Sequence, residues 1–347
     1  MYTPRFNPNS AISNWKARLE YLKGYPGKAM SDVLNGGFFG AGIEATGGNV
    51  VDYVQSGVSY RAHTFTSSGS FVLTSNPDDQ KFELLIVAGG GGAGNASNGG
   101  GGGAGGMRTF LNGGSSPDNG SISLSPATYS VTIGAGGAYA GNNGNVSEFL
   151  VDTSTTPDSY RATYGGRGGT GWGTTAHAGG SGGGGAGDNT SANYGGNGNW
   201  TEGNSPGYSP VEGYAGGGGN MSWNGNSCAG GGAAGAGGLN DSSGTGGQGG
   251  LARSTVITPD GVTTYYAGGG GGGSWNQAGG HSGYYIANSS SLAGGGMGRG
   301  WQTNTGGAGS DGAANTGVGG GGSNASYGGY DGGSGIVVVR YTLDGTF

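Results

Sequence analysis

The chain has 347 residues, of which 95 are Gly, 32% are hydrophobic and 9% are charged, so a conventional side-chain core must be small. The net charge is -6 and every lysine precedes the glycine-rich part, which argues against a nucleic-acid partner; the lysines are Lys16, Lys23, Lys28 and Lys81. Cys228 is the only cysteine, which excludes an internal disulfide and a cysteine-based metal site.

The N-terminus lacks the features of a signal peptide, because no basic start is followed there by an apolar segment. No run of about 18 apolar residues occurs along the chain. We therefore expect neither signal-peptide export nor a transmembrane segment.

Residues 1–55 differ in composition from the rest, and we interpret them as an attachment segment made of short helices. Apolar residues at helical spacing predict a helix over residues 11–23, and a second short helix is expected over residues 28–34. The stripe on the first helix consists of Ile12, Trp15, Leu19 and Leu22. We expect it to dock on a partner or on symmetry mates, or alternatively to cap the β-region of its own chain. The stripe also permits a homotrimer.

Residues 56–164 are expected to form the β-rich part of a glycine-rich domain, since the hydrophobic period becomes two. The pattern predicts two strands over residues 60–74, joined at Ser67 to Gly69, and a buried strand over residues 82–88. Tyr129, Val131 and Ile133 define one face of a further strand, whose neighbours are NVSEFLV and SYRATYGG. A closing strand is expected within residues 335–347, at Ile336 to Val339.

Short glycine runs recur between about Gly89 and Gly335, and no Gly-X-Y register persists, which excludes collagen. Glycine at this level is typical of disorder, but the low charge and the 6 Trp, 19 Tyr and 9 Phe argue against it. Runs of this length suit polyglycine II helices, which can hydrogen-bond sideways because they lack Cβ atoms. We expect residues 165–334 to form such a bundle. Alanines within the runs are expected at its outer faces or beside the sheet, at Ala93, Ala104, Ala186, Ala233 and Ala236.

The predicted fold is therefore mainly β plus irregular structure. A β-sheet or sandwich region packs on a bundle of short polyglycine II helices, and a small helical segment precedes it.

The order of several motifs resembles the glycine-rich domain of bacteriophage tail-fibre proteins. The motifs are FTSSGSFVLT, FELLIVAGGGGAG, GGGGGAGGM, TYSVTIGAGG, repeated GGSGGGG-like runs and a closing GGSGIVVVRYT, and they cover about residues 60–342. The glycine tract also resembles the receptor-binding adhesins at the fibre tips of T-even-like phages. In those proteins polyglycine II helices form a sandwich, and the loops between them bind the host surface. The N-terminus matches no attachment domain of that family.

Catalysis has little support in the sequence. The histidines are His63, His177 and His281, and none has Asp, Glu or Cys at metal-ligand spacing. No glycine run is followed by Lys-Ser or Lys-Thr, so a phosphate-binding loop lacks its charged residue. We expect no catalytic site, no metal site and no cofactor.

Patches of Trp or Tyr beside Asn, Gln and Thr separate the glycine runs, and this combination suits binding of sugars and protein loops. The candidate receptor-binding residues are Trp172, Asn199, Trp200, Trp223, Asn224, Trp275, Asn276, Tyr284, Tyr285 and Trp301. Some of these aromatic side chains are expected instead to cover the sides of the bundle.

The sequence and the resemblance together predict a phage fibre or fibre-tip protein of the virion, made in the host cytoplasm. Residues 1–55 would contact other virion proteins, and the loops would bind a host surface glycan or outer-membrane protein. One alternative is a structural virion protein, a head fibre or decoration, whose loops contact other virion chains. An ice-binding protein is a third hypothesis, but it requires regular Thr or Ala rows that the aromatic patches interrupt.

Overall fold

The structure is a computed structural model that describes residues 42–76, 79–95, 99–151, 160–170, 175–186, 202–218, 230–238, 246–274, 309–323 and 328–343. The chain divides into two compact units, Met1–Gly42 and Ile43–Phe347, and the described part belongs almost entirely to the second. The helices expected over residues 11–23 and 28–34, with Ile12, Trp15, Leu19 and Leu22, lie outside the described residues.

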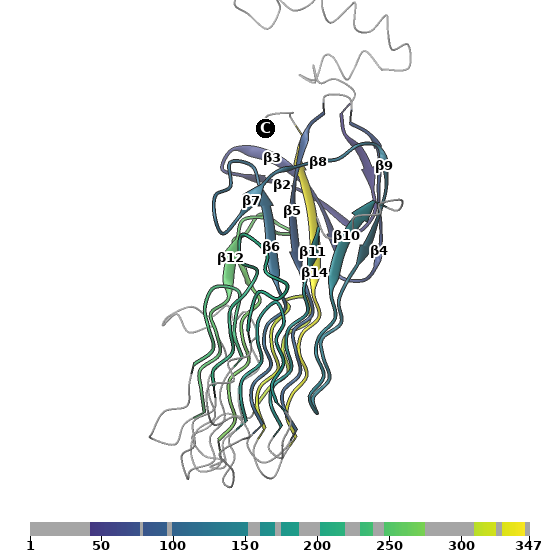
Figure 1. The fold of residues 1–347 in the computed structure, drawn as a ribbon. Coiled ribbons are helices and arrows are strands. Elements are labelled where there is room, and N and C mark those ends of the chain that lie inside the picture. Colours follow the sequence, from purple (N-terminus) through teal and green to yellow (C-terminus); the bar gives the residue numbers. More distant parts are fainter. Residues whose placement is uncertain are drawn as a thin grey trace, which may run out of the picture. The chain divides into compact units, whose positions relative to one another are not determined.

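The second unit is mainly β, and its described residues contain strands but no helix (Figure 1). The strands are β1 (Glu44–Thr46), β2 (Asn49–Gln55), β3 (Val58–Phe65), β4 (Gly69–Ser75), β5 (Lys81–Val87), β6 (Met107–Leu111), β7 (Asn119–Gly120), β8 (Ile122–Ser123), β9 (Ala127–Thr132), β10 (Ser147–Val151), β11 (Arg161–Ala162), β12 (Arg253–Thr255), β13 (Thr264–Tyr266) and β14 (Ile336–Thr342). They form sheets of seven, five and two strands, and the pairs are antiparallel except β6 with β7.

The seven-stranded sheet has the order β2-β3-β14-β5-β6-β7, and β8 pairs with β5 off this path. The last strand in the chain order, β14, therefore lies between the early strands β3 and β5. Val338 in β14 faces Thr64 of β3 on one side and Leu85 of β5 on the other. Every residue of β14 is buried, as expected for a continuous apolar run in a central strand. The strands predicted at residues 82–88 and 336–339 are confirmed, and the glycine-rich chain leaves and re-enters the sheet on adjacent strands.

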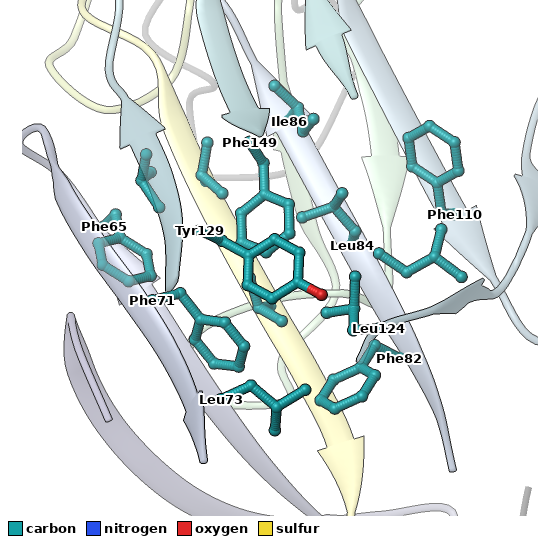
Figure 2. Packing of buried hydrophobic residues seen from close by; sticks show 14 of the residues in the cluster. Phe65, Phe71, Leu73, Phe82, Leu84, Ile86, Phe110, Leu124, Tyr129 and Phe149 are labelled. Carbon is teal, nitrogen blue, oxygen red and sulfur yellow. The ribbon is translucent and has the colours of Figure 1, made fainter. Parts of the chain in front are cut away.

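The five-stranded sheet, β1-β4-β9-β10-β11, packs on the seven-stranded sheet across the larger core (Figure 2). Tyr129 and Val131 are buried, which confirms the predicted inward face of β9. Aromatic rings fill the space between the sheets: the rings of Tyr129 and Phe149 stack at 5.1 Å, and Phe71 lies 5.9 Å from Phe149. This part of the chain is a conventional β-sandwich.

The described strands and hydrogen bonds cross the limits of three of the expected segments. β1 and β2 lie within residues 1–55, because the alternating sequence NVVDYVQ forms a half-buried strand. The two-stranded sheet β12-β13 lies within residues 165–334, where the sequence predicts a bundle of glycine helices with polar and aromatic loops. The glycine runs at residues 89–94 and 99–106 were assigned to the β-rich part, but they hydrogen-bond to the later runs.

The glycine runs continue from the strands and lie side by side below the sandwich (Figure 1). Their backbone hydrogen bonds follow a period of three residues. Gly89 and Gly92 donate to the carbonyls of Asn145 and Asn142, Gly90 and Ala93 to those of Gly333 and Tyr330, and Gly91 and Gly94 to those of Gly103 and Gly100. Each run therefore bonds to neighbours in three directions.

The run at residues 99–106 follows the same rule. Gly100, Gly103 and Gly106 donate to Gly169, Gly166 and Thr163, while Gly102 and Gly105 donate to Gly320 and Gly317. Burial at the edge of the bundle also has a period of three: residues 161, 164, 167 and 170 are partly exposed, and the residues between them are buried.

Glycine is required inside the bundle because the backbones are too close for side chains. A Cβ atom on Gly102 would lie 2.0 Å from the carbonyl oxygen of Gly91. Alanine is accommodated beside the sheet, where Ala104 and Ala233 join the second core cluster, as predicted. Ala93 and Ala186 are buried, whereas Ala236 is exposed at an outer face.

Candidate functional site

The ends of the glycine runs that lie away from the strands meet in one region, the bundle end (residues 94–95, 99–100, 169–170, 184–186, 217–218, 273–274 and 322–323) (Figure 1). The Ser323 hydroxyl accepts from Gly99 N–H at 3.0 Å and donates to the carbonyl of Gly94 at 3.1 Å. Backbone bonds join Gly100 to Gly169, Gly169 to Gly184, and Gly185 to Gly217.

All ten candidate receptor-binding residues lie outside the described residues. They fall in residues 171–174 (Trp172), 187–201 (Asn199 and Trp200), 219–229 (Trp223 and Asn224) and 275–308 (Trp275, Asn276, Tyr284, Tyr285 and Trp301). The described residue before each of these segments is Thr170, Ala186, Gly218 or Ser274. All four belong to the bundle end, so each candidate segment continues from that region.

A polar cluster lies on the side of the bundle, and its Arg167 precedes the segment that holds Trp172 by four residues. This Arg167 cluster consists of Asn143, Arg167 and His177. Asn143 Oδ1 accepts from the Arg167 backbone N–H at 3.0 Å, and its Nδ2 lies 3.3 Å from His177 Nδ1. Arg167 Nη2 lies 2.8 Å from His177 Nε2. Burial and the nearby Arg167 charge hold the pKa of His177 below its usual range.

His63 lies in the core rather than at an accessible site. Its Nδ1 is 2.8 Å from the carbonyl oxygen of Gly47, and its ring stacks on Tyr341 with centroids 5.8 Å apart. Burial lowers the pKa of His63. Its geometry is that of a packed structural residue. His281 and Cys228 lie outside the described part of the chain.

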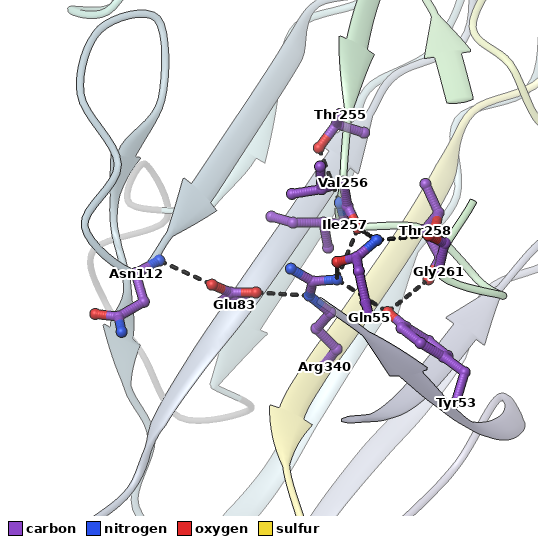
Figure 3. Close-up of polar contacts among 10 residues, drawn as sticks. All are labelled: Tyr53, Gln55, Glu83, Asn112, Thr255, Val256, Ile257, Thr258, Gly261 and Arg340. Atoms are coloured by element: carbon purple, nitrogen blue, oxygen red, sulfur yellow. Dashed lines mark hydrogen bonds and ion pairs between the residues drawn. The ribbon is translucent and has the colours of Figure 1, made fainter. Parts of the chain in front are cut away.

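A polar network around a buried ion pair connects strands of the seven-stranded sheet to residues 255–261 (Figure 3). Arg340 Nε donates to Glu83 Oε2 at 2.6 Å, and both side chains are almost fully buried. Arg340 Nη1 also donates to Tyr53 Oη, Gln55 Oε1 and the carbonyl of Val256. The remaining carboxylate oxygen of Glu83 accepts from Asn112 N–H. All of these contacts are internal, so this network positions strands.

Glu212 is a buried acid at the junction between the sandwich and the bundle. Its Oε2 accepts from Thr163 N–H at 3.0 Å, and its Oε1 has no hydrogen-bond partner. Burial raises the pKa of Glu212 to about 7, although the Thr163 hydrogen bonds and the Arg108 charge act in the opposite direction. Glu212 therefore titrates near neutral pH in the folded protein.

The described residues show neither a metal-binding cluster nor a membrane-spanning helix. No group of three or more His, Cys, Asp or Glu side chains within them is placed to hold a metal ion. No helix long and apolar enough to cross a membrane is found in the same residues.

The strands and hydrogen-bonded glycine runs define a mainly β, glycine-rich protein. The chain belongs to the glycine-rich domain family, whose match covers residues 66–342. A search of curated proteins found no match.

Proposed function

We propose that this chain is a bacteriophage fibre or fibre-tip protein that binds a host surface receptor non-covalently. Its binding residues would be those of the segments that continue from the bundle end. The observation that carries the proposal is that four separate segments, each containing at least one Trp, begin in one closely packed region at the end of the bundle. The motif order that resembles tail-fibre proteins gives the biological setting.

We further infer that the glycine runs are polyglycine II helices. A β-strand points successive N–H groups to opposite sides, so its hydrogen-bond partners repeat every two residues. Here the partners repeat every three, as expected for a helix with three residues per turn. The three-residue period of burial in residues 161–170 supports the same geometry.

This architecture suits receptor recognition. Each run is held by backbone bonds to several neighbours, so the segments that follow can vary in sequence without changing the packing beneath them. Anchored ends also reduce the ordering cost when a ligand binds. Many copies on one particle would raise avidity, so weak binding by a single copy suffices. Residues 1–55 would attach the protein to other virion chains.

Competition for adsorption tests the proposal. The purified full chain is expected to bind host cells and to slow adsorption of the phage that encodes it. A variant with Trp172, Trp200, Trp223 and Trp275 all changed to Ala should lose both effects. Val54→Ala, an exposed position in β2, is the matched control and should retain both. A full chain that neither binds cells nor slows adsorption would remove the basis for receptor binding.

The location of the chain in a cryo-EM map of the particle distinguishes receptor binding from the main alternative, a structural virion protein. A position at a fibre tip supports the proposal. A position within the capsid lattice, with the bundle end against other virion chains, would identify a structural component instead.

A further inference from the structure

The Arg167 cluster contains more hydrogen-bond donors than acceptors. An arginine nitrogen always donates, so His177 Nε2 must accept from Arg167 Nη2, and the neutral imidazole carries its proton on Nδ1. The backbone N–H of Arg167 fixes the Asn143 amide with Oδ1 toward it, which turns the Nδ2 donor toward His177. Two donors, Nδ1–H and Nδ2–H, therefore face each other across 3.3 Å. An external acceptor that bridges the two nitrogens from the outer side would satisfy both.

Arg167 also lacks a counter-ion in the part of the chain that the structure describes. Its Nη1 donates to the carbonyl of Gly141 at 2.9 Å, and its Nε is buried without a hydrogen-bond partner. In contrast, Arg61 pairs with Asp52 and Arg340 with Glu83. A partly exposed cation beside unsatisfied donors favours an anion with several acceptor atoms, and a carboxylate meets that requirement.

The surroundings of the cluster are regular along the bundle. Tyr164, Arg167 and Thr170 are partly exposed, and the glycines between them are buried. Successive members of this row are about 9 Å apart if the run rises as a polyglycine II helix. An aromatic ring and a hydroxyl thus flank the guanidinium along one line. A tyrosine ring offers a stacking surface for a sugar ring, and the row suits an elongated ligand.

We propose that the Arg167 cluster binds the carboxylate of an acidic polysaccharide whose chain lies along Tyr164, Arg167 and Thr170. The carboxylate accepts hydrogen bonds from Asn143 Nδ2 and His177 Nδ1 and neutralises Arg167. This site rests on the proposed function and deepens it, because it specifies the chemistry of a receptor bound next in sequence to the segment that holds Trp172. The regular row with a tyrosine favours a glycan over an acidic peptide.

Isothermal titration of the full chain at fixed pH and low salt tests the site. The probe is a tetramer of galacturonic acid, and its methyl ester is the matched ligand that keeps the sugar but removes the charge. The acid should bind and the ester should bind at least about tenfold more weakly. Arg167→Gln should weaken binding of the acid by a similar factor. Arg61→Gln, which removes an exposed arginine of β3, should leave the affinity unchanged.

A second measurement covers the case in which Arg167→Gln does not fold. The Nε–H resonance of wild-type Arg167 should shift in NMR spectra when the acid is added, and it should not shift with the ester. Equal affinity for acid and ester, no binding of the acid, or an unchanged affinity in folded Arg167→Gln would each overturn the proposal.

A tetraglutamate peptide is the third probe. Tighter binding of this peptide than of the acidic sugar would also overturn the proposal, in favour of an acidic protein partner. The receptor-binding function fails separately, since it depends on adsorption by the full chain and on the four tryptophans. A chain that blocks adsorption but does not bind the acidic sugar would leave that function standing.

Discussion

The sandwich and the glycine bundle are stabilised by opposite means within one compact unit. In the sandwich, backbone hydrogen bonds lie within each sheet, and aromatic and aliphatic side chains fill the space between the sheets. In the bundle, hydrogen bonds connect each run to neighbours in several directions, and most interior positions are glycines at which a Cβ atom would clash with a neighbouring backbone. The two regions should therefore respond oppositely to a change in side-chain volume.

The largest effect is expected when one methyl group is added inside the bundle. In Gly102→Ala the new Cβ would lie 2.0 Å from the Gly91 carbonyl oxygen and 3.1 Å from Gly320 N. To relieve this clash, the runs that contain Gly102 and Gly91 must move apart. That movement breaks several buried hydrogen bonds, each of which costs about 1–3 kcal/mol. We expect a loss of about 5 kcal/mol in the free energy of unfolding, or no folded protein.

Gly120→Ala is the control for this substitution, since a Cβ there meets no atom within 4 Å. Its free energy of unfolding, measured by denaturant titration, should change by less than about 1 kcal/mol. Similar losses for the two variants would contradict the close packing of the runs.

The second-largest loss of stability is expected when a side chain in the sandwich core is truncated. Phe149 is fully buried and stacks on Tyr129, so Phe149→Ala should cost about 4 kcal/mol through lost burial and a residual cavity. Phe149→Leu keeps most of the volume and should cost about 1 kcal/mol. Thermal and denaturant unfolding of both variants measure the difference. An equal cost for Ala and Leu would show that the aromatic core is not the main source of sandwich stability.

The contrast between the regions also explains which parts of the fold could be predicted. The strands at residues 82–88, 127–132 and 336–342 have clear apolar patterns, and each was predicted close to its observed position. β2 alternates as clearly, but it lies within residues 1–55, which the sequence predicts as an attachment segment of short helices. β12 and β13 have three residues each, too few for a periodic signal.

The pairing of the glycine runs could not be predicted, because their sequences are nearly identical and local patterns do not distinguish one neighbour from another. The candidate site shows a similar limit. Arg167 is conspicuous as a charge within GGRGG, and Glu212 as an acid before a glycine run. That Asn143 and His177 meet at Arg167 depends on contacts between separate runs.

The smallest of the three effects is expected at the junction of the two regions and depends on pH. Burial raises the pKa of Glu212 to about 7 in the folded protein, from 4.5 for an exposed glutamate. The folded state therefore binds more protons than the unfolded state between these values, so the free energy of unfolding falls as pH rises through this window. The free energy of unfolding should fall by about 3 kcal/mol across this window, with no further loss above pH about 7.

Glu212→Gln mimics the protonated acid. Relative to this variant, wild type should be equally stable near pH 4 and about 3 kcal/mol less stable near pH 8. Glu44→Gln, an exposed position in β1, is the control and should track wild type at both pH values. Denaturant titrations at each pH measure the free energy of unfolding of both proteins. If wild type and Glu212→Gln differ by the same amount at every pH, Glu212 ionises freely in the folded protein.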